Sequence, residues 1–140
     1  MDLKLSPPEL ALRDDLRDWL DTNYSFETHL VRTSINQSRD DELWQGLVAK
    51  GWIARALPRR DALEQSVIDA SIIAEEFGRA VVAEPFFRSG FLAANIIFEA
   101  AEPEIADELI ERIGASADRY ACALYEPHSR YRLSVVDTTA

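Results

Sequence analysis

The sequence predicts a mainly α-helical protein, an up-and-down bundle of about five helices followed by one or two β-strands that begin a β-domain. Apolar residues recur at intervals of three and four over most of the chain, which is the helical period. From Arg119 the pattern changes to strict alternation, the period of a strand. We therefore expect a helical domain over residues 1–117 and the incomplete start of a β-domain over 118–140.

The first helix is predicted to begin at Ser6. Ser6 and Glu9 have the spacing of a capping box, and Pro7 occupies a position where its missing N–H costs nothing. The apolar face of this helix consists of Leu12, Leu16, Trp19 and Leu20.

The second helix is predicted to begin at Asp40 or Asp41 and to end at Lys50, with Gly51 as a left-handed stop. Before it, the residues from Thr22 to Arg39 predict a loop with a short helical turn at 26–31. His29 lies in this loop, and we expect it to be a solvated side chain.

An extended segment is predicted from Trp52 to Pro58, followed by a charged turn at Arg59–Asp61 that we expect on the solvated surface. Asp61 is the expected cap for the lead-in to the central helix.

The stretch Ser66–Phe87 is predicted to contain the central helix, in which Gly78 interrupts the pattern near the end and Pro85 closes it. Most of its circumference is apolar, so other helices should cover it. Its polar side chains should share the face that meets water or a partner; they are Asp69, Glu75, Glu76 and Arg79.

Two further helices complete the predicted bundle. Ser89 is the expected cap of the first, in which Asn95 is a polar residue among apolar neighbours and must find a hydrogen-bond partner. We expect a backbone partner rather than a ligand. The last helix should run from Pro103 to Gly114.

Alternation over Tyr120–Tyr125 predicts a first strand, Glu126–Pro127 a turn, and 132–136 a second strand. Two strands alone are marginally stable in water. The sheet is therefore expected to continue in a longer architecture or to be completed by another chain.

Composition excludes several classes of function. Fifteen basic against 25 acidic residues give a net charge of -10, which would repel a phosphate backbone, so we expect no nucleic-acid partner. The sequence contains no leader pattern and no uninterrupted apolar span, so we expect no membrane association. Cys122 is the single cysteine, which favours a cytoplasmic location and predicts no metal site.

The order of these features resembles the acyl-CoA dehydrogenase family, specifically its N-terminal helical domain and the first part of its middle β-domain. The matching stretches cover most of the chain: Leu5–Ser6 to Leu12–Arg13, Gly51-Trp52-Ile53 with Ala56-Leu57-Pro58, Ile73–Ala80 with Glu84-Pro85-Phe86, and Ala121–Pro127. The resemblance implies FAD as cofactor, an acyl-CoA thioester as substrate and α,β-desaturation as the reaction, within lipid metabolism.

Site residues follow from the resemblance position by position. It places Cys122, Leu124 and Tyr125 beside the flavin, and the helix with Phe87, Phe91 and Asn95 along the acyl pocket. The alternative for the latter three residues is plain core packing. No catalytic residue is assigned, because the base of the family lies in a C-terminal helical domain that this sequence does not contain.

Two functions remain open. In the first, the chain is a supporting subunit or fragment of an acyl-CoA dehydrogenase-like oxidoreductase, of the type of subunit that has lost its flavin site. Tyr125, where the family has threonine, and the bulky residues 128–131 favour that type. In the second, it is a non-catalytic helical interaction module. Both require a protein partner or a homo-oligomer.

Overall fold

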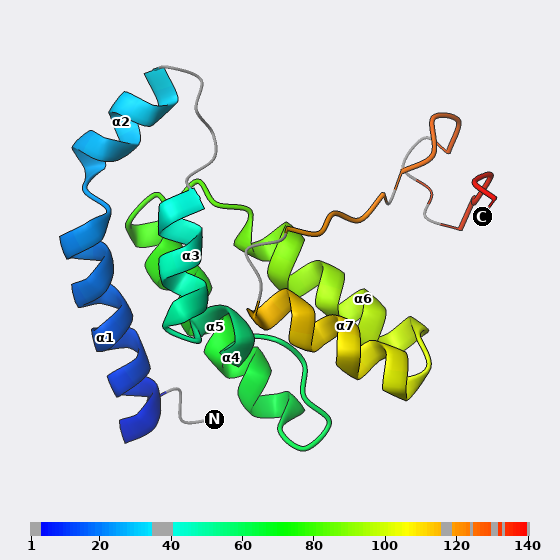
Figure 1. Ribbon diagram of the computed structural model, residues 1–140, viewed down its shortest axis with the longest axis horizontal. Coiled ribbons are helices and arrows are strands. Elements are labelled where there is room, and N and C mark those ends of the chain that lie inside the picture. Colours follow the sequence, from blue (N-terminus) through cyan, green and yellow to red (C-terminus); the bar gives the residue numbers. More distant parts are fainter. Residues whose placement is uncertain are drawn as a thin grey trace.

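The computed structural model describes residues 4–34, 41–115, 119–123, 125–129, 132 and 134–139. Within these residues the chain is mainly helical, which confirms the predicted class (Figure 1). The helices are α1 (Pro7–Asn23), α2 (Phe26–Ser34), α3 (Asp41–Ala49), α4 (Trp52–Arg55), α5 (Leu63–Arg79), the π-helix η1 (Phe86–Leu92), α6 (Ala93–Ala100) and α7 (Pro103–Ala115).

Helix α5 is central, as predicted. Helix α1 packs along it, η1 packs against its C-terminal part, and α4 joins it to the pair formed by α6 and α7 (Figure 1). Helix α2 lies at the edge of the molecule and packs sparsely against the other described helices. None of the described helices is both long and apolar enough to cross a bilayer.

The predicted helix signals at Ser6 and Gly51 are confirmed. The backbone N–H of Ser6 donates to Glu9 Oε2 at 2.6 Å, and Ser6 takes the N-cap position of α1. Gly51 has a φ of 74°, a left-handed conformation that glycine adopts without strain. The chain therefore ends α3 and turns directly into α4.

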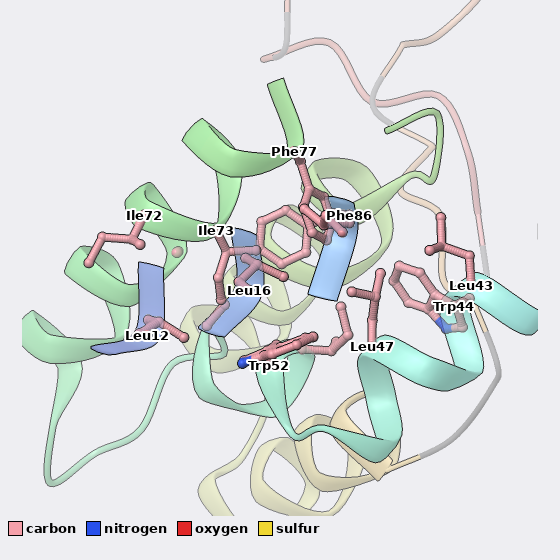
Figure 2. Close-up of a cluster of buried hydrophobic side chains, with 14 of the residues drawn as sticks. Leu12, Leu16, Leu43, Trp44, Leu47, Trp52, Ile72, Ile73, Phe77 and Phe86 are labelled. Carbon is pink, nitrogen blue, oxygen red and sulfur yellow. The ribbon is translucent and has the colours of Figure 1, made fainter. Parts of the chain in front are cut away.

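The core forms where large apolar side chains from five helices meet. Figure 2 shows Leu12 and Leu16 of α1 converging with Trp52 of α4 and with the inner face of α5, while Phe86 of η1 lies beside Phe77. Residues of α5 on this inner face are buried; they are Ala70, Ile72, Ile73 and Phe77. Burial of this kind is the main term favouring the fold, at roughly 1.5–3 kcal/mol for each large side chain.

Two acidic residues of α5 face the core, and the prediction that they meet water or a partner is wrong. Glu76 is fully buried between Arg17 Nη2, at 2.6 Å, and Arg79 Nε, at 2.7 Å. Asp69 is equally buried and accepts from Arg55 Nε at 2.7 Å. Burial is tolerated because each carboxylate is paired with an arginine whose own side chain reaches solvent.

The predicted extended segment after Gly51 is also wrong in its first half. Trp52–Arg55 form helix α4, and the Arg55 N–H donates to the Gly51 carbonyl at 3.0 Å. The adjacent side chains of Trp52 and Ile53 are both buried, which helical geometry permits between two packed layers but a half-exposed strand does not.

Helix α5 begins and ends earlier than predicted. Ala62, not Asp61, is its N-cap, and the helix ends at Arg79. Ser89, the predicted cap of the next helix, instead lies inside η1, because helical geometry already starts at Phe86, directly after Pro85. The buried Ser89 hydroxyl donates to the backbone carbonyl of Tyr120.

No strand is present in the described residues after α7, in contrast to the prediction. Alternation alone does not make a strand, because backbone groups need a second strand to pair with. The segment is held to the helices by Arg119, whose guanidinium contacts Asp41 and Glu84 at 2.7 Å each and lies 5.1 Å from the Trp44 ring centre. The predicted domain boundary at residue 117 and part of the second strand fall outside the described residues.

The pairing of Glu76 with two arginines makes the stability of this fold dependent on pH. The hydrogen bonds from Arg17, and then from Arg79, hold the pKa of the Glu76 carboxyl below its ordinary value of 4.5. The ionised carboxylate therefore stabilises the folded state above that pH, and the contribution is lost as the pH falls through the lower, folded-state pKa. Glu76→Gln should lower the free energy of unfolding by about 1–3 kcal/mol at pH 7. It should also reduce the fall of that free energy between neutral and acidic pH, as measured by urea unfolding.

Asp14→Asn is the matched control, because the Arg13–Asp14 pair lies at the surface, and its change should stay within about 0.5 kcal/mol. If the Glu76 variant lost as much stability on acidification as the wild type, the stabilising role of the Glu76 carboxylate would be contradicted.

Candidate functional site

The outer face of α5 is apolar but open. Val67 and Val81 belong to the apolar pattern that predicts the central helix, but they are 45% and 47% exposed, and Ala74 between them is exposed as well. Because α1 covers only the inner face, this side of the helix retains an apolar strip.

Two adjoining cavities lie along this strip, and together they form what we call the Phe87 groove. Their volumes are about 390 and 110 Å³, and they share Ala74, Phe86 and Phe87. The lining is otherwise supplied by His29, Val67, Ala70, Ser71, Phe77, Gly78, Val81, Val82, Ala83, Glu84 and Phe91.

Aromatic rings from η1 form one wall of the Phe87 groove. Phe87 and Phe91 are stacked, with ring centres 5.6 Å apart, and Phe87 is 60% exposed. Beneath them Phe86 is buried and meets Phe77 edge to face at 5.2 Å. An exposed ring resting on a second ring provides a firm apolar surface at low conformational cost.

The polar groups of the groove are already bonded to the protein. The Ser71 hydroxyl donates to the Val67 carbonyl at 2.8 Å, and the Glu84 carboxylate is held by Arg119. At the far end, the Tyr24 hydroxyl and His29 Nδ1 lie 3.0 Å apart. The groove therefore presents an apolar surface whose single acid is neutralised in place.

The turn between α5 and η1 contains a strained residue. Val81 has a φ of 56°, a left-handed conformation that is unfavourable for a β-branched side chain. The Val82 N–H donates to the Phe77 carbonyl at 2.9 Å, so Val81 stands where such helix ends commonly have glycine. The valine side chain projects into the groove lining at the cost of this strain.

The residues predicted to contact substrate fall partly on this site. Phe87 and Phe91 line the 110 Å³ cavity. Asn95 does not line it: its side-chain amide donates to the Phe91 carbonyl at 2.7 Å, which is the backbone partner expected from the sequence. Asn95 thus braces the junction of η1 and α6, and a role in binding an acyl chain stays a prediction for all three residues.

The residues predicted to contact flavin lie on the C-terminal segment. Cys122 is half-buried and Tyr125 is 65% exposed, while Leu124 falls outside the described residues. The Glu126 carboxylate accepts the Thr138 N–H at 3.1 Å. The described residues of this segment form no strand, and contact of Cys122 and Tyr125 with a flavin stays a prediction.

His29 is a groove residue that the sequence pattern did not reveal. Its ring is stacked on Phe26, with centres 6.1 Å apart, and borders the larger cavity. The helical spacing of Phe26, His29 and Leu30 was the available signal, but the polar residues around it favoured a loop.

A separate cleft of about 490 Å³ lies between the α4–α5 connection and α7. Its two arginines are bonded to the protein: Arg60 pairs with Asp107 at 3.2 Å, and Arg59 Nε donates to Ser66 Oγ at 3.4 Å. With Asp61 and Glu111 also in the lining, the cleft has no surplus of positive charge for an anionic ligand. The surface role predicted for Arg59–Asp61 therefore agrees with its surroundings.

Comparison with known proteins adds no family assignment. No protein-family model, curated protein or solved structure matches the chain. Among the described residues there is also no group of three metal-ligating side chains.

Strain at Val81 predicts an unusual response to mutation. Val81→Gly should raise the free energy of unfolding by about 0.5–1 kcal/mol, because glycine adopts a positive φ freely. Ala80→Gly is the matched control at a residue with ordinary helical φ and should lower it by a similar amount. Urea unfolding of both variants checks this, and equal destabilisation in the two would contradict strain at Val81.

Proposed function

We propose that this chain is a supporting part of an acyl-CoA dehydrogenase-like protein, in which the Phe87 groove forms one wall of the site for the acyl chain of a thioester. The observation that carries the proposal is the groove itself, which is apolar, open along one side and walled by stacked phenylalanines. The predicted substrate residues Phe87 and Phe91 stand in that wall.

The groove suits an alkyl chain better than a polar ligand. Each methylene transferred from water into an apolar site contributes about 0.8 kcal/mol, and the groove offers such contacts along the strip from Val67 to Val81. A polar ligand would need free hydrogen-bonding groups, whereas Ser71 and Glu84 are already bonded.

Flavin and the catalytic base belong to another chain in this proposal. Tyr125 stands where the family has threonine, and no residue of this chain is assigned the role of the base. The chain would then bind and orient the acyl group, while desaturation takes place in the completed assembly.

One observation favours the alternative, a non-catalytic interaction module. Phe26 and Leu30 are 60% and 51% exposed and lie one turn apart on α2. Neighbouring exposed apolar side chains are typical of protein–protein contacts, whereas single ones are common on any surface. In that case the groove would serve protein contacts alone, and acyl-CoA would not bind.

Titration with decanoyl-CoA, with free CoA as the reference ligand, tests the proposal. Decanoyl-CoA should raise the melting temperature of the chain, and its affinity should exceed that of shorter acyl-CoA molecules by roughly three- to fourfold per methylene. Phe87→Asp should weaken binding at least tenfold, on the order of 1.4 kcal/mol.

Ile105→Asp provides the matched control, since Ile105 is an equally exposed apolar residue on α7, away from the groove. It should leave the affinity unchanged. Equal affinity for decanoyl-CoA and CoA would contradict the proposed function and favour the interaction module, whereas flavin retained on the purified chain would count against that module.

A further inference from the structure

We infer that the Phe87 groove is covered, when no acyl ligand or catalytic partner is bound, by helix α2 of a second copy of this chain. The two surfaces involved are the groove and the apolar face of α2, which consists of Phe26, His29 and Leu30. They are continuous, because His29 belongs to the α2 face and also borders the larger cavity of the groove.

Charge on these surfaces favours self-association at this place. The chain carries a net charge of -10, so two copies repel each other over most of their surface. The groove lining contains one acid, Glu84, which pairs with Arg119 at 2.7 Å; the same guanidinium also pairs with Asp41. The lining carries little of the net charge, so two copies repel each other less here than over the rest of the surface.

The apolar area is sufficient for a specific dimer. A stable interface buries about 800 Å² on each partner, of which about 56–65% is apolar. The exposed parts of Phe26, Leu30, Val67, Val81 and Phe87 amount to roughly 400–500 Å², given that a large side chain presents on the order of 150–200 Å². That is the apolar share that such an interface needs.

The α2 face and the Phe87 groove are complementary in shape. Phe26 and Leu30, four residues apart, project from one face of an edge helix, while the groove is concave, with a volume of about 390 Å³ in its larger part. In a twofold dimer, α2 of each copy lies in the groove of the other, so one kind of contact is made twice and the assembly closes. Figure 1 shows α2 at the edge of the molecule, where a second copy has access to it.

This inference concerns the groove assigned above to the acyl chain but does not require that assignment. If both hold, acyl-CoA and the second copy compete for the same surface. Decanoyl-CoA would then shift the equilibrium from dimer to monomer, which makes the failure of either proposal separately visible.

Sedimentation equilibrium of the full chain tests the dimer. The wild-type chain should be dimeric at about 100 µM, and its dissociation constant should fall as salt is raised toward about 1 M, where the screening length is about 3 Å. Phe87→Ser and Phe26→Ser should each raise the dissociation constant at least tenfold. Ile105→Ser, at an exposed position outside both surfaces, should not change it.

Mixing the two variants tests the pairing itself. A heterodimer of Phe87→Ser with Phe26→Ser keeps one intact contact of Phe26 with Phe87, so it should form more tightly than either variant alone. A monomeric wild type at 100 µM, or equal weakening by Ile105→Ser, would overturn the dimer. A mixture no tighter than its components would overturn the α2-to-groove pairing. A dimer that decanoyl-CoA leaves unchanged would uphold this inference and contradict the proposed function.

Discussion

The buried Glu76 carboxylate, held between Arg17 and Arg79, fixes the position of α5 against α1. A buried charge is tolerated only in an arrangement that pairs it, so α5 is turned about its axis such that Glu76 meets Arg17 of α1, while Arg79 on α5 itself completes the pairing. That rotation directs Ile73 and Phe77 into the core. It leaves Val67 and Ala74 on the outer side of α5, next to the exposed Val81 of the following turn.

The groove is therefore a consequence of how α5 is held. The turn after α5 passes through the strained Val81, and η1 then begins directly after Pro85 and brings Phe87 over Phe91 beside the open strip. π-Helical segments are rare and commonly occur at functional sites. The backbone strain at Val81 and the π-helical geometry of η1 are both unfavourable locally. Val81 and Phe87 nevertheless both line the Phe87 groove.

Much of the helical architecture could be predicted from local signals. The capping pair Ser6–Glu9 and the left-handed Gly51 each depend on neighbours in sequence, and each was predicted correctly. The apolar period of α5 predicted a helix, but not that Val67 would be exposed. The burial of Asp69 and Glu76 could not be predicted, because it depends on arginines of other helices, Arg55 at 14 and Arg17 at 59 residues away. The described residues after Arg119 form no strand for a related reason: alternation favours an extended chain, but a strand also needs a second strand to pair with.

At the site, Phe87 and Phe91 were identified through a resemblance, whereas His29 needed the position of α2 in space. The most direct measurement of the central claim is photo-crosslinking with an acyl-CoA that carries a diazirine at the end of its acyl chain, followed by mapping of the labelled peptides. Labels confined to the peptides containing Val67–Ala74 and Phe86–Phe91 are the predicted result. Labels on α7, or spread evenly over the chain, would contradict it.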